Sequence, residues 1–147
     1  MKLWVQRVTE AAVSAGGEVL ASIGAGLLVL FAAKAGDGPD KVPRLAKRLA
    51  ALRIFEDPDG KTNLSVMDTG GSVLAVSQFT LYADTKHGHR PGFSLAARPE
   101  TALPLYLSFV GELKRIMGDG RVGTGRFGAE MRVSLVNDGP FSVELEE

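Results

Sequence analysis

Residues 72–84, Ser-Val-Leu-Ala-Val-Ser-Gln-Phe-Thr-Leu-Tyr-Ala-Asp, constrain the fold of this chain more than any other stretch. The first half is a short apolar run behind a Gly-Gly break, which is typical of a strand buried on both faces. Polar residues then arrive where the strand would continue. Two-residue alternation predicts Ser77 and Phe79 on one face of that strand, and Gln78 and Thr80 on the other.

Polar groups that lie in a core must form hydrogen bonds within the protein or interact with a ligand. An unpaired buried donor or acceptor costs about 1 to 3 kcal/mol. The residues alone therefore leave two interpretations open for this segment, a structural polar cluster and a functional site.

Length and composition narrow the classes of protein. The 147 residues fit a single domain, which we place at residues 1–147. Residues 24–35 form an apolar run far shorter than the ~20 residues that cross a bilayer, so we expect a soluble intracellular protein with no membrane partner. The chain has no cysteine, which excludes a thiolate nucleophile and thiolate metal ligands.

Charge places a further limit on the partners. Seventeen basic and seventeen acidic residues give a formal net charge of zero, so no global field attracts nucleic acid. A nucleic-acid partner would need a local basic patch.

Apolar periodicity in the first half predicts three antiparallel strands at residues 2–13, 18–23 and 27–33, followed by a helix from Asp37 to about Arg53. Pro39 lies near the start of this helix, where proline is tolerated. One helix face is basic and fits either a solvated surface or a phosphate-binding patch; it carries Lys41, Arg44, Lys47 and Arg48.

The second half predicts a short strand at residues 64–67, a helix opening at Pro99, and strands at 121–127, 129–136 and 141–145. Pro104 suggests that this helix starts late or irregularly, and residues 137–140 read as a turn. The fold class is therefore α+β, a mixed β-sheet or small barrel with two helices.

Conventional hydrolytic machinery is missing from the pattern. Ser77 and Thr80 are candidate nucleophiles, yet they fall on opposite strand faces and outside any Gly-x-Ser-x-Gly elbow. His87 and His89 lie on a glycine-containing loop, which disfavours both a catalytic triad and a metal site. No cofactor motif occurs, so we expect no cofactor. Arg7, within an apolar strand, is either a strand-edge charge in solvent or a group facing the active cleft.

Two segments carry a family resemblance. Residues 77–84 together with Asn137-Asp-Gly-Pro140 resemble the two signature motifs of the D-aminoacyl-tRNA deacylases. Residues 6–8, 24–29, 53–55, 90–93 and 125–127 are also similar to that family at the expected spacings. Ser142 stands where the second motif usually has threonine, and the hydroxyl is kept.

The resemblance implies a cytoplasmic homodimer that hydrolyses the ester of D-aminoacyl-tRNA at its 3′ end and has no DNA partner. It further implies substrate-assisted catalysis, in which the neighbouring ribose hydroxyl helps water attack. In that mechanism the amide of Phe79 or Thr80 donates to the developing oxyanion, while Ser77 and Gln78 hold the strand end. Thr80 orients the substrate and does not attack it.

The same resemblance assigns substrate binding to Arg7, Asn137, Gly139 and Pro140. It makes Gly139–Pro140 a cis peptide that reaches into the partner subunit's site and rejects L-residues by a steric clash with the β-carbon. Glycine has no β-carbon, so hydrolysis of glycyl-tRNA is also expected.

Two alternatives from other classes remain open at this point. One is a small-ester or amide hydrolase that uses Thr80 as its nucleophile. The other is a non-enzymatic RNA-binding module, which the zero net charge disfavours.

Overall fold

The chain opens with an antiparallel unit whose first strand is central. In the computed structural model, which describes residues 1–147, one edge of β1 (Lys2–Ala15) pairs with β3 (Gly26–Ala32) along its first half and with β2 (Glu18–Ile23) along its second half. Gly16 and Gly17 make the β1–β2 turn with φ values of 60° and 84°, which glycine adopts without steric cost. The three expected strands are present, but β2 and β3 both run antiparallel to β1, so the chain does not reverse between them.

Parallel strands extend this unit into a mixed sheet. β6 (Ser72–Ser77) lies parallel to β3, and β7 (Val122–Thr124) lies parallel to β6. β8 (Arg132–Glu146) runs antiparallel along nearly the whole of β1. A separate short hairpin joins β4 (Arg53–Glu56) to β5 (Thr62–Ser65), of which only the second strand was expected.

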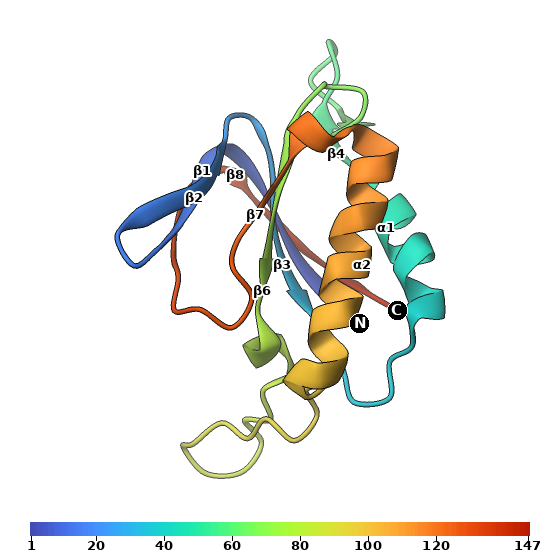
Figure 1. Ribbon diagram of the computed structural model, residues 1–147. Helices are drawn as coiled ribbons and strands as arrows, with labels where there is room; N and C mark the ends of the chain where they lie inside the picture. Colours follow the sequence, from blue (N-terminus) through green and yellow to red (C-terminus); the bar gives the residue numbers. More distant parts are fainter.

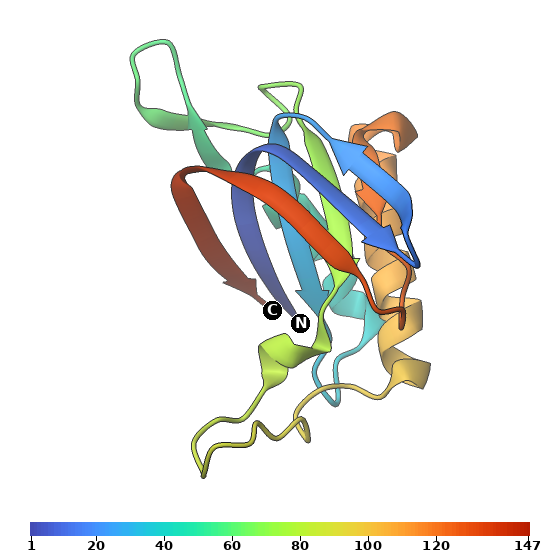
Figure 2. The ribbon, with the colours of Figure 1, turned by 90° about the vertical axis from the view of Figure 1, so that its left-hand side faces the viewer.

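The sheet curls until it nearly closes into a barrel (Figure 2). β2 passes so close to β7 that a β-carbon added at Gly123 would lie 3.1 Å from the β-carbon of Ala21. Buried side chains from β1, β3 and β6 fill the space under the curl; they are Val8, Ala11, Val13, Leu28, Leu74 and Val76. The mixed sheet or small barrel predicted from the sequence is therefore confirmed.

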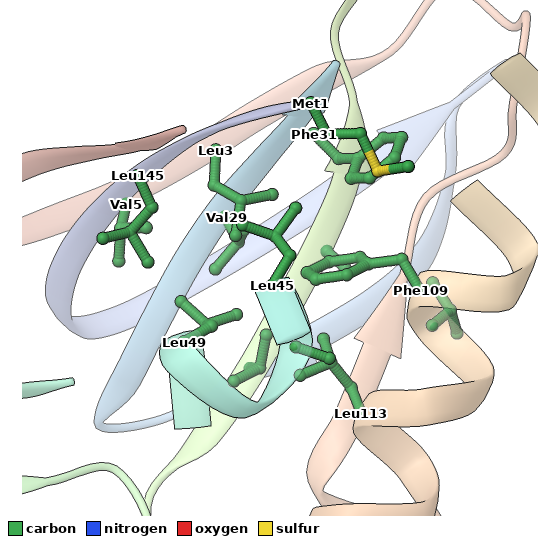
Figure 3. Close-up of a cluster of buried hydrophobic side chains, with 14 of the residues drawn as sticks. Met1, Leu3, Val5, Val29, Phe31, Leu45, Leu49, Phe109, Leu113 and Leu145 are labelled. Atoms are coloured by element: carbon green, nitrogen blue, oxygen red, sulfur yellow. The ribbon is translucent and has the colours of Figure 1, made fainter. Parts of the chain in front are cut away.

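Two helices, α1 (Val42–Ala50) and α2 (Pro99–Met117), cover the other face of the sheet (Figure 1). Leu45 and Leu49 of α1 meet Phe109 and Leu113 of α2 above the sheet residue Val29 in the main core (Figure 3). A 3₁₀ turn, η1 (Pro39–Lys41), leads into α1. The predicted helix is shorter than expected, because the chain leaves it at Ala50 and starts β4 at Arg53. No helix is long and apolar enough to cross a membrane.

The expectation of a late start for the second helix is wrong. α2 begins at Pro99 and continues through Pro104. An interior proline costs a helix about 3 kcal/mol or more. The buried side chains Leu105, Tyr106 and Phe109, which follow Pro104 directly, hold the helix on the sheet and offset that cost.

The strand predicted across residues 72–84 ends at Ser77 instead. Gln78 donates a last backbone hydrogen bond to Phe31, and β3 itself ends at Ala32, so no neighbouring strand continues the ladder. The chain turns into a 3₁₀ turn, η2 (Phe79–Tyr82), which satisfies its own carbonyls. The predicted alternation of faces beyond Ser77 is therefore wrong.

The turn predicted at residues 137–140 does not reverse the chain either. β8 continues through it as a single strand, and the separate strands expected at 129–136 and 141–145 are its two halves. Gln6 pairs with Ser142 and Val8 pairs with Asn137, so Asp138 to Phe141 all lie opposite the single residue Arg7. We call these residues, 138–141, the β8 bulge. It lies at the opposite end of the sheet from η2 (Figure 2).

Candidate active site

A largely apolar pocket of about 590 Å³ opens where β3 and β6 end. Its walls come from those strand ends, the start of α2 and the segment after β7. The lining includes Ser77, Gln78 and Phe79, three of the residues expected to be catalytic. A pocket of this size with few polar groups is typical of a small-molecule site.

Two backbone N–H groups stand free beside this pocket. Phe79 and Thr80 begin η2, and the first residues of a helical turn have no partner for their amides within it. Neither amide donates to any other acceptor in the protein, whereas Leu81 donates to Gln78 and Ala83 donates to Thr80. Both residues are exposed. The pair is therefore available to stabilise negative charge on a bound molecule.

The side chains beside these amides are poorly suited to nucleophilic attack. Gln78 Nε2 donates to Thr80 Oγ1 over 2.5 Å, and no imidazole or carboxylate hydrogen-bonds either the Ser77 or the Thr80 hydroxyl. No three side chains of His, Asp or Glu converge closely enough to hold a metal ion. The arrangement offers donors for an oxyanion without an activated nucleophile.

The two tyrosines near the site do not supply a general base. Burial raises the pKa of Tyr106 to about 12, and its hydroxyl donates to the Ala75 carbonyl at 2.9 Å, beneath β6. Burial likewise raises the pKa of Tyr82, which follows Thr80 in η2. Both phenols stay protonated at ordinary pH, so a general base would have to be another group.

The remaining predicted site residues gather around Arg7 at the β8 bulge. Arg7 is 6% exposed, so the solvent-facing alternative for this residue is wrong. It donates to the carbonyls of Ile54 and Asp138 at 2.7 Å and 3.1 Å. It also pairs with the Asp138 carboxylate at 3.2 Å, and its guanidinium lies 5.0 Å from the centre of the Phe141 ring. Arg7 thus fastens the bulge to β1 and to β4.

Asn137 closes the bulge from its other end. Its Oδ1 accepts from the Phe141 amide at 2.8 Å, and its Nδ2 donates to Ser142 Oγ at 3.0 Å. The family-typical hydroxyl at position 142 is therefore used. Gly139 has a φ of 130°, and a β-carbon there would lie 3.2 Å from an Arg7 nitrogen. Gly139–Pro140 is a cis peptide.

The two clusters do not meet within one chain. Arg7 pairs with Leu27 at the start of β3, and Ser77 pairs with Phe31 near its end. Four residues of strand separate these positions, a distance of about 13 Å along the sheet. Ser77, Gln78, Phe79 and Thr80 are therefore brought together in one place, and Arg7, Asn137, Gly139 and Pro140 in another.

Comparison with known proteins identifies the family of this chain. A sequence profile described as "D-Tyr-tRNA(Tyr) deacylase" matches residues 4–146. The chain belongs to this family. Proteins named "D-aminoacyl-tRNA deacylase" from Akkermansia muciniphila and from a Roseiflexus species are 51% and 53% identical to it. Both alignments cover 99% of this chain, and they cover 97% and 93% of those two proteins respectively.

Solved structures agree with the deacylase fold. A structure titled "c-Myc DNA Unwinding Element Binding Protein" superposes with a TM-score of 0.95 and 40% identity, covering 100% of this chain and 99% of that one. A structure titled "Structural Analysis of a probable eukaryotic D-amino acid tRNA deacylase" has a TM-score of 0.83 at 17% identity, covering 98% of this chain and 97% of that one. The second likeness supports the deacylase fold alone.

Sequence reasoning missed several residues that line this pocket. Phe31, Arg98 and Phe127 line it, as does Phe93, whose ring meets the ring of Phe79 edge-on at 5.0 Å. Phe93 and Phe127 stand within segments that resemble the family, which was the available signal. Phe31 and Arg98 gave no such signal in the sequence. Phe31 lies in an apolar run that is typical of an ordinary buried strand.

Proposed function

We propose that this protein hydrolyses the ester bond of D-aminoacyl-tRNAs in the cytoplasm and releases the free D-amino acid and tRNA. Membership of the deacylase family supports the activity. The observation that carries the mechanism is the pair of unbonded amides of Phe79 and Thr80 beside the apolar pocket. The aromatic walls of that pocket suit the terminal adenosine of the tRNA.

In the proposed reaction, the ribose hydroxyl next to the ester assists attack by water on the carbonyl carbon. The carbonyl oxygen gains negative charge as the tetrahedral intermediate forms, and one or both free amides donate to it. The ester oxygen then leaves with a proton as the ribose hydroxyl. Ser77 and Gln78 hold the strand end in place, and Thr80, already bonded to Gln78, orients the substrate.

We further propose that a homodimer completes the site. Arg7 beside the β8 bulge and Ser77 before the amides are offset by about 13 Å along the strands of one sheet, so in this proposal a second copy brings its own bulge to the pocket. A two-fold axis completes two such sites, because the pocket of each copy then meets the β8 bulge of the other copy. Trp4 supports such an interface: it is 36% exposed on the sheet face opposite the helices, beside the half-buried Leu30.

Chirality follows from this arrangement. Backbone carbonyls at Gly139 and Pro140 of the second copy would hold the substrate's amino group, while the pocket holds its ester end. A D-residue can then send its side chain outward, whereas an L-residue drives its β-carbon into the bulge. Glycyl-tRNA lacks the β-carbon and escapes this exclusion.

The deciding experiment incubates the purified protein with D-tyrosyl-tRNA, L-tyrosyl-tRNA, glycyl-tRNA and a simple activated ester. We expect hydrolysis of the first and third and essentially none of the second and fourth. Comparable rates on the two tyrosyl-tRNAs would contradict the proposal. Cleavage of the simple ester alone would favour the hydrolase with Thr80 as nucleophile, and no cleavage at all would favour an RNA-binding module.

The shared site has its own test, in which Phe79→Pro and Gly139→Ala protomers are mixed. Each homodimer would be inactive, but a mixed dimer would hold one site with both defects and one intact site. We expect activity to reappear on mixing. Sedimentation showing an active monomer at assay concentration would rule out the shared site.

A further inference from the structure

Residues 85–98 carry only basic charges in this electrically neutral chain. We call them the basic segment. They contain Lys86, Arg90 and Arg98 together with both histidines of the protein, and they contain no aspartate or glutamate. Residues 85–95 are all exposed. A local basic patch of the kind that a nucleic-acid partner needs is therefore present despite the zero net charge.

The basic segment runs directly past the pocket. It follows η2, which carries the free amides, and it ends at Pro99, where α2 begins. Phe93, Ala96, Ala97 and Arg98 near its end line the pocket. Its first part, residues 85–91, projects beyond the ends of the strands as an open loop (Figure 1). Paired backbone hydrogen bonds between Asp84 and Gly92, at 2.7 Å and 2.8 Å, close the base of this loop.

The cations of the segment are free to meet a ligand. Lys86, Arg90 and Arg98 form no salt bridge within the chain. The basic face of α1 differs, because Arg44 and Arg48 both pair with Glu147, and Lys41 pairs with Asp37 at 2.7 Å. Of the two surfaces that could have served as a phosphate-binding patch, only the segment beside the pocket has all of its Lys and Arg side chains unpaired, because three of the four on the basic face of α1 form salt bridges.

We propose that the loop at residues 85–91 binds the phosphates of the single-stranded 3′ end of the tRNA, upstream of the nucleotide held in the pocket. This inference rests on the proposed function, since it assumes that the pocket takes the terminal adenosine. The nucleic-acid strand must leave the pocket, and Lys86 and Arg90 lie on the loop that connects η2 with the pocket-lining residues Phe93 to Arg98. Their ammonium and guanidinium groups form charge-assisted hydrogen bonds with phosphate oxygens.

Binding of this kind predicts a dependence on substrate length. The phosphates contribute to affinity and leave the ester chemistry unchanged, so they act on KM more than on kcat. They also make affinity depend on salt, with a slope of about −0.7 in log K against log salt for each single-strand phosphate contact. Removing two contacts should therefore reduce the slope by about 1.4.

The test compares Lys86→Ala/Arg90→Ala with wild type on two substrates, D-tyrosyl-tRNA and 3′-O-(D-tyrosyl)adenosine, which has no phosphate. We expect KM for the tRNA to rise about tenfold, kcat to stay within about twofold, and the slope to fall by about 1.4. Kinetics on the adenosine ester should match wild type. Arg98 is left unchanged in the variant because it lines the pocket.

Two further variants control for lost charge and for folding. Lys47→Ala/Lys61→Ala removes the same charge from exposed residues on α1 and on the β4–β5 turn, and it should leave KM and the salt slope unchanged. Lys86→Arg/Arg90→Lys keeps both charges and should restore KM to within about threefold of wild type.

Each outcome decides a different point. An unchanged KM and salt slope on the tRNA overturns the inference while leaving the deacylase activity intact. An equal loss on both substrates also overturns it, because the loop would then shape the pocket. If wild type cleaves neither substrate, the proposed function itself falls.

Discussion

After the end of β6, Phe79 and Thr80 leave their backbone N–H groups unpaired, whereas at the β8 bulge the side chains of Arg7 and Asn137 hydrogen-bond to the backbone. The amides of Phe79 and Thr80 have no acceptor, and both residues are exposed. Around the bulge, Arg7 engages the backbone and side chain of Asp138, and Asn137 engages the Phe141 amide. The start of η2 therefore offers backbone donors to a ligand, and the β8 bulge is fixed in its conformation by hydrogen bonds within the chain.

This difference matches two tasks of a selective ester hydrolase. Groups that stabilise a developing charge must be unpaired until the transition state forms. A group that rejects the wrong enantiomer by steric clash must instead resist displacement, because a yielding wall would admit the L-residue. The open region therefore suits the chemistry, and the fastened region suits the selection.

The largest effect should come from removing one open donor. Phe79 is the first residue of η2, where proline is tolerated, and Gln78 before it has a φ of −149°, outside the α region that proline disfavours. Phe79→Pro and Phe79→Ala both lose the ring, but only the proline variant loses the N–H. We expect single-turnover hydrolysis of D-tyrosyl-tRNA to be about 10²- to 10³-fold slower in Phe79→Pro than in Phe79→Ala. Equal rates would show that this amide does not bind the oxyanion.

The next effect should come from releasing the bulge. Arg7→Ala leaves the buried carbonyl of Ile54 unpaired and should lower the free energy of unfolding by about 2 to 4 kcal/mol. It should also raise the ratio of L- to D-tyrosyl-tRNA hydrolysis. Arg7→Lys keeps the charge without the forked geometry of the guanidinium, so its unfolding free energy and its L/D ratio should lie between those of wild type and Arg7→Ala.

Arg53→Ala provides the matched control for this release. Arg53 also donates to a backbone carbonyl, that of Asn63, but it is exposed, so we expect a loss under about 1 kcal/mol. Denaturant unfolding combined with the two tyrosyl-tRNA assays measures both consequences. An unchanged L/D ratio in Arg7→Ala would show that the contacts of Arg7 with the bulge do not contribute to the rejection of L-residues.

A smaller effect should come from loosening one end of the bulge. Asn137→Ala removes the acceptor for the Phe141 amide and the donor to Ser142, and it should lower the unfolding free energy by about 1 to 2 kcal/mol. Asn137→Asp keeps the acceptor and should lose less. Thermal unfolding of wild type and the two variants in one buffer would order them, and equal losses in the two variants would assign the main contribution to the hydrogen bond with Ser142.

The smallest effect should come from Thr80. Because its hydroxyl accepts from Gln78 and no base activates it, Thr80→Ala should slow hydrolysis only several-fold, and Thr80→Ser should be near wild type. Replacing the ribose 2′-hydroxyl of the substrate with hydrogen should be far worse. A dead Thr80→Ala variant together with normal reaction of the deoxy substrate would establish a threonine ester mechanism instead.

The sequence by itself determined the elements with strong periodicity. The three opening strands and the helical stripe of Tyr106, Phe109 and Leu113 follow from apolar spacing, since burial of those side chains is the dominant favourable term in folding. The family resemblance likewise identified both motifs. These elements and motifs could be predicted because each depends on the types and spacing of residues that are close together in the sequence.

The tertiary structure alone decided where those motifs end and what they meet. β6 stops at Ser77 because its neighbour β3 ends, and that freed the amides of Phe79 and Thr80. The segment at 137–140 bulges because Arg7 and β1 hold both halves of β8 in one ladder. The end of β6 and the β8 bulge both depend on pairing between strands that are distant in sequence. The residues next to a position along the chain do not indicate which residues it pairs with across the sheet.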